Sequence, residues 1–180
     1  MNQQVLEEIR ASVRGFRLPR YHEIPSVGLY LEQVTKYVGE CLAPLYDDEI
    51  TGSMISNYVK RGLVANPVRK QYSRDQIAYL IFIMCAKKVV STDHVKLMIA
   101  IQRETYTAER AYNYFCNEFE NILEYVFGEK PAVDVIGVDN TNEKIMLRNA
   151  IVTAAHKIYL DKLFGALQKQ QSSTKKDPSQ

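Results

Sequence analysis

Residues 53–76 read SMISNYVKRGLVANPVRKQYSRDQ, and the order of residue types in this stretch decides the fold that we expect. Its first part has the spacing of an amphipathic helix, because Ile55, Tyr58 and Val59 return to one face of the helix. Gly62 follows directly and suits the left-handed position that closes a helix. The sequence therefore predicts a short helix with one apolar and one polar face.

The second part of the stretch predicts a β-hairpin followed by another helix. Branched residues on both sides of Asn66-Pro67 favour a two-stranded ribbon over about 63–72. Ser73 and Gln76 then form a capping box, in which each side chain accepts a hydrogen bond from the other residue's backbone amide. Helix, ribbon and capped helix in this order are typical of a winged helix-turn-helix.

The polar face of the first helix, over about 53–61, has the residue types of a recognition helix. Short donors and acceptors suit the edges of DNA bases, and cations suit phosphates. We expect base contacts from Ser53, Ser56, Asn57 and Lys60. We expect phosphate contacts from Arg61, Arg69, Lys70 and Arg74.

The charge of the chain is concentrated in the same region. Residues 51–90 hold seven Lys and Arg against one acidic residue, whereas residues 1–50 and 91–165 each carry a net charge of −3. One basic segment on an acidic body is the pattern expected when a single face meets a polyanion. The alternative interpretation is a chance cluster on a solvated surface.

The whole 180-residue chain is predicted to be all-α apart from the small β-hairpin wing. We expect an N-terminal helix and a proline-containing arm over 1–28, and the winged helix-turn-helix over 29–104. Two long amphipathic helices should fill 105–168, and the Gln-, Ser- and Lys-rich residues 169–180 are expected to be a disordered tail.

The first of the two long helices is unusually aromatic. Residues 105–127 include Tyr106, Tyr112, Tyr114, Phe115, Phe119, Tyr125 and Phe127. We expect a homodimer through the C-terminal helices, because groove-reading proteins commonly pair two half-sites by symmetry. The alternatives are packing within one chain and a pocket for an unidentified small-molecule effector, since tyrosine offers an apolar body with a polar tip.

The decisive stretch resembles the end of the recognition helix and the wing of MerR-type regulators. Those proteins have an isoleucine, a tyrosine, a Gly-Leu run, a proline and a basic wing that closes on a tyrosine. The matching residues here are Ile55, Tyr58, Gly62, Leu63, Pro67, Arg69 and Tyr72. The resemblance implies a MerR-like winged helix-turn-helix that binds double-stranded DNA and regulates transcription.

The chain departs from the MerR pattern in three places. Ser56 and Asn57 stand where the usual recognition helix has arginine and tyrosine, the wing is several residues shorter, and residues 44–49 form an acidic insertion. An acidic insertion beside the groove would repel phosphate.

A second resemblance covers more of the chain. Residues 18–120 resemble a bacterial family catalogued as domain of unknown function 1836, and the family's implied role is a MerR-like DNA-binding module. The most recognisable parts are Pro-Arg-Tyr at 19–21, Ser-Met-Ile-Ser-Asn-Tyr-Val-Lys at 53–60 and Ala-Tyr-Leu-Ile at 78–81.

Other functional classes have little support in the sequence. His22, His94 and His156 stand alone without a nucleophile nearby, so we expect no enzyme, no catalytic residues and no cofactor. The cysteines Cys41, Cys85 and Cys116 lack zinc-ligand spacing, and we expect buried thiols and no metal, with metal or redox sensing by Cys85 or Cys116 as the alternative. No apolar run approaches the roughly 20 residues of a membrane span, and no secretory signal is visible, which predicts a cytoplasmic protein without a membrane partner.

Two rival functions stay open beside DNA binding. A helical protein–protein interaction adaptor that has lost nucleic-acid binding would explain the acidic body and the missing recognition arginine. RNA binding is the third reading, although RNA-binding modules use a platform of stacked aromatic residues that the sequence does not show.

Overall fold

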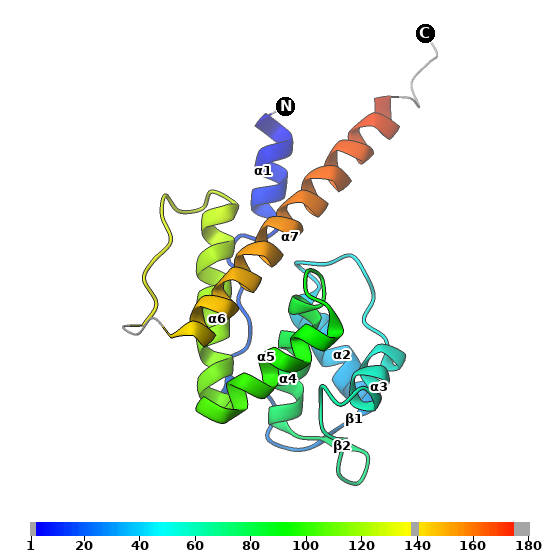
Figure 1. Ribbon diagram of the computed structural model, residues 1–180. Coiled ribbons are helices and arrows are strands. Elements are labelled where there is room, and N and C mark those ends of the chain that lie inside the picture. The colour runs from blue at the N-terminus through cyan, green and yellow to red at the C-terminus, as the bar shows by residue number, and fades with distance from the viewer. Residues whose placement is uncertain (1–2, 138–140, 175–180) are drawn as a thin grey trace.

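The computed structural model describes residues 3–137 and 141–174 and is mostly helical, with a small two-stranded sheet. Figure 1 shows helices arranged around α4 (Arg74–Ala86), while α1 (Gln3–Ala11) and the far part of α7 (Asn142–Thr174) project together from one end. The all-helical prediction is confirmed at this level.

Helix α4 is the centre of the core. Its side chains are apolar on every side, and the members that solvent does not reach are Ile77, Leu80, Ile81 and Ile83. The helix packs against α2 (Leu31–Leu42), α6 (Ala108–Val126) and α7. A helix that is hydrophobic all round must be covered all round, so α4 fixes where its neighbours lie.

The predicted capping box opens α4. The Gln76 amide nitrogen donates to Ser73 Oγ at 3.4 Å, and the Ser73 amide nitrogen donates to Gln76 Oε1 at 2.7 Å. Gln76 Nε2 also donates to the Ala65 carbonyl at 2.8 Å. One buried amide side chain therefore ties the loop after α3 (Gly52–Lys60) to the start of the central helix.

The predicted ribbon over 63–72 is wrong. The strand β2 (Gln71–Tyr72) pairs antiparallel with β1 (Leu29–Tyr30), which precedes α2, and within the loop there is a single bridge from Val68 to Gln71. Two physical reasons account for the difference. Leu63 and Val64 are buried in the core, and Pro67 has no amide hydrogen to donate to a ladder.

The C-terminal helices belong to the same core as the rest of the chain. Apolar residues from Val13 to Ile158 form one continuous cluster, so the expected division at residue 104 does not separate two cores. Helix α5 (Thr92–Thr105) begins after its N-cap Ser91, whose Oγ accepts from the His94 amide at 3.3 Å. The predicted disordered tail begins too early, because α7 continues to Thr174 and residues 175–180 lie outside the described part.

The aromatic residues of α6 pack within the chain. Phe115 stacks on Phe119 with ring centroids 5.4 Å apart and meets Phe82 of α4 edge-on at 5.3 Å. Both phenylalanines are buried core residues, whereas Tyr125 near the end of the same helix is 45% exposed.

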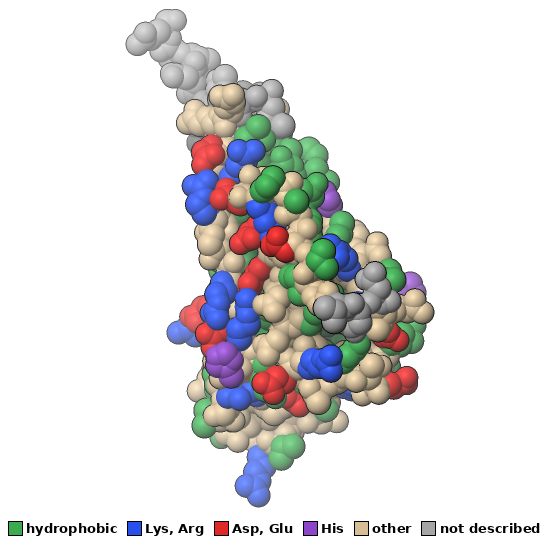
Figure 2. All heavy atoms as spheres, turned by 90° about the vertical axis from the view of Figure 1, so that its left-hand side faces the viewer, with side chains coloured by type: hydrophobic (Ala, Val, Ile, Leu, Met, Phe, Trp, Pro, Cys, Tyr) green, Lys and Arg blue, Asp and Glu red, His purple; other side chains and the backbone are tan. Residues whose placement is uncertain are grey.

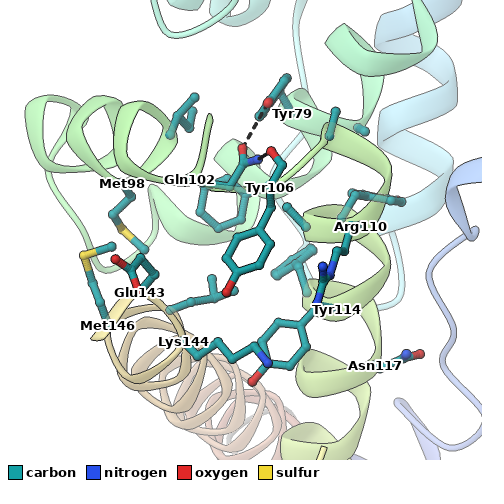
Figure 3. Close-up of a pocket in the computed structure, with 18 of the residues that line it drawn as sticks. Tyr79, Met98, Gln102, Tyr106, Arg110, Tyr114, Asn117, Glu143, Lys144 and Met146 are labelled. Carbon is teal, nitrogen blue, oxygen red and sulfur yellow. Dashed lines mark hydrogen bonds between the residues drawn. The ribbon is translucent and has the colours of Figure 1, made fainter. Parts of the chain in front are cut away.

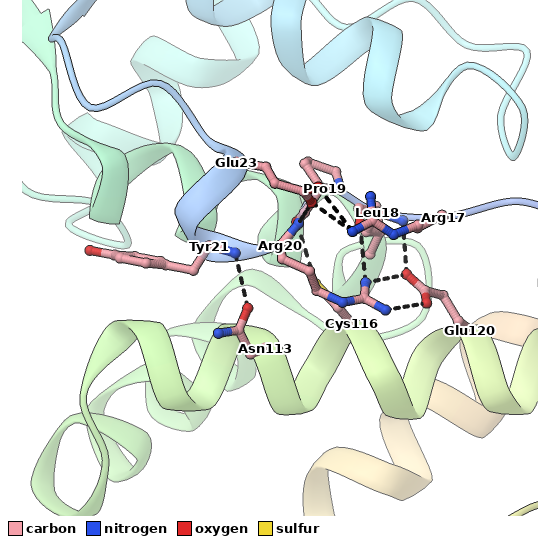
Figure 4. A network of polar contacts seen from close by, with 9 residues as sticks. All are labelled: Arg17, Leu18, Pro19, Arg20, Tyr21, Glu23, Asn113, Cys116 and Glu120. Carbon is pink, nitrogen blue, oxygen red and sulfur yellow. Dashed lines mark hydrogen bonds and ion pairs between the residues drawn. The ribbon is translucent and has the colours of Figure 1, made fainter.

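The N-terminal arm is attached to α6 by a partly buried ion pair (Figure 4). Arg20 donates from both terminal nitrogens to the two carboxylate oxygens of Glu120, each at 2.6 Å. The Leu18 amide donates to the same carboxylate at 2.9 Å, and the Tyr21 amide donates to Asn113 Oδ1 at 2.9 Å. The arm is thereby fixed across the helix and passes into the 3-10 turn Tyr21–Glu23.

We predict that Arg20→Ala destabilises the protein by roughly 1–3 kcal/mol, because it leaves the carboxylate of Glu120 partly buried without its cation. Arg17→Ala is the matched control, since the Arg17–Glu23 pair is exposed and should contribute little. Urea unfolding of both variants measures the difference. Equal effects of the two substitutions would show that the buried pair does not hold the arm.

Candidate nucleic-acid interface

Helix α3 presents its polar face to solvent. Ile55 and Tyr58 are buried under the helix, and burial raises the pKa of the Tyr58 phenol. All four residues predicted to read bases are exposed: Ser53, Ser56, Asn57 and Lys60. The helix forms on the apolar stripe that the sequence predicts. It begins after the N-cap Thr51, whose Oγ1 accepts from the Met54 amide at 3.3 Å.

Helix α3 ends in a Schellman motif. Gly62 has φ +73°, its amide donates to the Val59 carbonyl at 2.9 Å, and the Leu63 amide donates to the Tyr58 carbonyl at 3.0 Å. The predicted C-terminal cap is confirmed. This motif turns the chain sharply, so that the loop toward β2 continues beside the end of α3.

Two cations occupy a strained turn in the loop between α3 and β2. Val68 and Gln71 exchange backbone hydrogen bonds of 3.1 and 2.9 Å, and the two residues between them, Arg69 and Lys70, have φ of +52° and +63°. Positive φ at both central positions defines a type I′ turn, which favours Asn-Gly. Neither Arg69 nor Lys70 hydrogen-bonds or ion-pairs with any residue in the described ranges, and both are exposed.

We define the α3–turn surface as Ser53, Ser56, Asn57, Lys60 and Arg61 of the helix end together with Arg69 and Lys70 of the turn. Figure 1 shows α3 and the turn before β2 on the same side of the molecule, away from α1 and α7. From Thr51 to Arg74 the chain contains no carboxylate. By contrast, the face over α6 and the 128–137 linker mixes basic and acidic side chains (Figure 2).

Helix α5 adds charges that the sequence analysis did not assign to this site. Lys96 Nζ donates to the Arg61 carbonyl at 3.2 Å, which places a further cation at the end of α3. The Arg61 guanidinium meets Asp93 Oδ1 at 3.1 Å in an exposed pair. Lys96 lies 35 residues from Arg61 in the sequence, so no local pattern could have assigned it.

Arg74 is held by the arm. Its Nε donates to the Ile24 carbonyl at 2.8 Å, and the guanidinium carbon lies 5.4 Å from the centre of the Tyr21 ring. Tyr21 in turn donates its hydroxyl to Asp75. The expected phosphate contact is therefore in competition with these contacts, and Arg74 is not part of the α3–turn surface.

The acidic insertion over 44–49 contacts the chain just after the C-terminal end of α4. Asp48 pairs with Lys88 at 2.6 Å, and the Lys88 ammonium keeps the pKa of that carboxyl below its ordinary value. Lys88 also lies over the Tyr46 ring at 4.7 Å. This carboxylate is therefore neutralised by a cation that follows α4.

The cysteines offer no reactive site. Burial raises the pKa of Cys85 and of Cys116 to about 12 and that of Cys41 to about 11. Thiols with such pKa values are almost fully protonated at neutral pH, which makes them weak nucleophiles. Within residues 3–137 and 141–174, no three metal-ligating side chains of the His, Cys, Asp and Glu types come together, and no helix has the length and apolarity to cross a membrane.

Comparison with known protein families places most of the described core in one family. The family described as "Domain of unknown function (DUF1836)" matches residues 19–115, which is more than half of the chain. The match begins in the arm and ends within α6, so it includes the α3–turn surface and leaves out α7. No curated protein and no solved structure matches this chain.

We predict that replacing the turn residues by Asn-Gly, as Arg69→Asn with Lys70→Gly, raises the free energy of unfolding by about 1–2 kcal/mol. The reason is that these residues adopt positive φ at little cost, whereas arginine and lysine do not. The matched control Arg69→Ala with Lys70→Ala removes the same charges and keeps the unfavourable backbone, so it should give no gain. A double-alanine variant as stable as the Asn-Gly variant would refute strain in this turn.

Proposed function

The chain belongs to the DUF1836 family, and we propose that this member is a DNA-binding transcriptional regulator that uses the α3–turn surface. One observation carries the proposal: an exposed polar helix face lies beside two cations that occupy an unfavourable backbone conformation. Strain of this kind persists in proteins where the side chains it presents are used. Nothing in the core requires charged residues at the tip of this turn.

In this proposal the helix and the turn divide the recognition of DNA between them. Ser53, Ser56, Asn57 and Lys60 face the base edges, and the Asn57 amide suits the paired donor and acceptor of adenine. Arg61, Arg69 and Lys70 meet phosphates on either side of the groove. Phosphate contact would replace the exposed Arg61–Asp93 pair, which costs little to open.

We further propose that the arrangement is a shortened MerR-like winged helix-turn-helix. Helices α2 and α3 would be the helix pair and the Val68–Gln71 turn the wing. The β1–β2 ladder supports this assignment because it holds the turn against the start of α2. Helix α3 has serine and asparagine where MerR-type regulators have arginine and tyrosine. In this proposal, the turn therefore contributes a larger share of the affinity for DNA.

A protein–protein interaction adaptor is the second candidate. Two apolar side chains on or beside the same surface favour it, namely Met54, which is 36% exposed, and Val68, which is 75% exposed. Apolar groups at the centre of a polar rim are typical of a protein interface. The salt dependence of binding separates this candidate from the DNA-binding one.

We predict that the protein binds a pool of random-sequence duplex DNA with an affinity that falls steeply with salt. Three cations on phosphates, Arg61, Arg69 and Lys70, give a slope of about −2 to −3 for log K against log salt per chain. Arg69→Ala with Lys70→Ala removes two of these phosphate contacts and should reduce the magnitude of this slope by about 2. Fluorescence anisotropy over a salt series measures both values.

Arg17→Ala with Lys157→Ala is the control for this prediction, since it removes two exposed, ion-paired cations away from the α3–turn surface. The control should keep the parent slope. An equal loss of slope in both double variants would show that the affinity for DNA depends on net charge and not on this surface. No binding of DNA even at low salt would favour the adaptor.

We also propose that the regulator is a homodimer through α7. The projecting part of this helix carries Leu160 and Phe164, which are 43% and 55% exposed. Exposed large apolar side chains on one element mark an interaction surface. A second copy is the natural partner, because two identical half-sites on DNA are read by two identical chains.

Sedimentation velocity tests the dimer. Leu160→Glu with Phe164→Glu should shift the protein from dimer to monomer, because it places two carboxylates in an apolar contact. Ile145→Glu changes an exposed apolar residue at the opposite end of α7 and should leave the dimer intact. A monomeric parent protein would contradict the proposal directly.

A further inference from the structure

A cavity of about 410 Å³ lies between α4, α5, α6 and α7. Its size falls in the range of small-molecule sites. Figure 3 shows residues of all four helices facing it, with Met98 and Met146 at one side and Arg110 and Tyr114 at the other. Because helices from distant parts of the sequence meet here, the cavity exists only in the folded chain.

The walls of the cavity are apolar and aromatic. Phe82 and Phe115 line it and support each other in an edge-to-face contact of 5.3 Å. Met98 and Met146 add flexible thioethers, which adapt to the shape of a bound group. Such walls select a flat, largely apolar ligand.

A hydrogen-bond chain holds the aromatic end of the cavity in place. Tyr79 donates its hydroxyl to Gln102 Oε1 at 2.9 Å, and Gln102 Nε2 donates to the Tyr106 carbonyl at 2.6 Å. These bonds fix the amide in one orientation and secure the backbone that carries the Tyr106 ring. The site is therefore formed before any ligand binds.

Two cations lie at the rim of the cavity. The Arg110 guanidinium is 5.1 Å from the centre of the Tyr106 ring, and Lys144 Nζ is 4.9 Å from the centre of the Tyr114 ring. Glu143 is the single carboxylate among the lining residues. Two cations and one carboxylate therefore line the cavity, and the cations lie beside the rings of Tyr106 and Tyr114.

We propose that this cavity binds a small aromatic anion, whose ring system lies among Phe82, Phe115 and the methionines and whose carboxylate or sulfonate meets Arg110 and Lys144. The inference goes beyond the proposed function by giving the protein a site for a small-molecule effector. Its test uses no DNA, so each proposal can fail without the other.

Helix α5 connects this cavity with the α3–turn surface. Its first half contacts the end of α3 through Asp93 and Lys96, and its second half lines the cavity with Met98, Ile99 and Gln102. A ligand that displaces α5 would displace the support of α3. This geometry gives an aromatic anion a direct physical route to alter DNA binding.

The test compares two dyes with the same ring skeleton on the full-length chain. Anilinonaphthalene sulfonate carries the anion, and phenylnaphthylamine lacks it. Fluorescence titration should show one saturable site for each dye, with tighter binding of the sulfonate. Ala111→Phe fills the cavity from α6 and should abolish binding of both dyes; Ala108→Phe serves if the first variant unfolds.

The charge assignment has its own variant pair. Arg110→Gln with Lys144→Gln should weaken the sulfonate roughly tenfold or more and leave the uncharged dye unchanged. Arg17→Gln with Lys157→Gln removes two cations elsewhere and should change neither affinity. Near-ultraviolet circular dichroism of each variant confirms native packing.

Each other outcome overturns the proposal. Dye binding that survives both cavity-filling variants would place the site elsewhere, such as on the exposed apolar residues of α7. If the Arg110→Gln, Lys144→Gln variant kept the parent ratio of the two dye affinities, these two residues would not bind the anionic group. No binding of either dye to the folded parent protein would leave the cavity without this role.

Discussion

The structure depends on the burial of the apolar residues of α4. Because Ile77, Leu80, Ile81 and Ile83 leave no polar side to face water, the chain must supply neighbours around the whole helix. Helix α2 covers one side, and α6 and α7 cover another. The buried Gln76 at its start then fixes the loop that follows α3 through the Ala65 carbonyl, so the position of the candidate interface follows from the same helix.

The burial of α4 also explains why functional groups lie outside the core. Leu63, Val64 and Tyr72 enter the core from the loop and β2, which leaves Arg69 and Lys70 between them with no interior to occupy. On the far side, the bulky α6 aromatics fill the core up to Phe115 and leave the space between α5 and α7 partly empty. One packed helix thus has a charged surface near its start and a cavity along its side.

Features that depend on near neighbours in the sequence could be predicted. The cap at Ser73, the glycine at position 62 and the buried side of α3 follow from spacing and backbone preference alone. Features that depend on distant partners could not. The partner of β2 is β1, which comes before α2 and α3 in the sequence and pairs Leu29 with Tyr72. No local pattern in 63–72 indicates this partner, so the predicted ribbon is wrong.

The candidate site divides in the same way. Exposure of Ser53, Ser56, Asn57 and Lys60 could be predicted because it follows from helical periodicity. Two other contacts depend on tertiary packing and have no local signal in the sequence. Arg74 donates to the Ile24 carbonyl, and Lys96 donates to the Arg61 carbonyl at the end of α3. The number of aromatic residues in α6 indicates a large apolar area, but the sequence does not indicate what this area contacts. In the folded chain, aromatic residues of α6 pack in the core and line the cavity.

The most direct test of the central claim is amide hydrogen exchange on the full chain with and without saturating duplex DNA. The account predicts that DNA slows exchange in residues 52–72, which include α3 and the turn, and leaves α6 and the far part of α7 unchanged. Protection confined to α6 or α7, or spread evenly over all exposed helices, would contradict the claim that α3 and its neighbouring turn form the nucleic-acid interface.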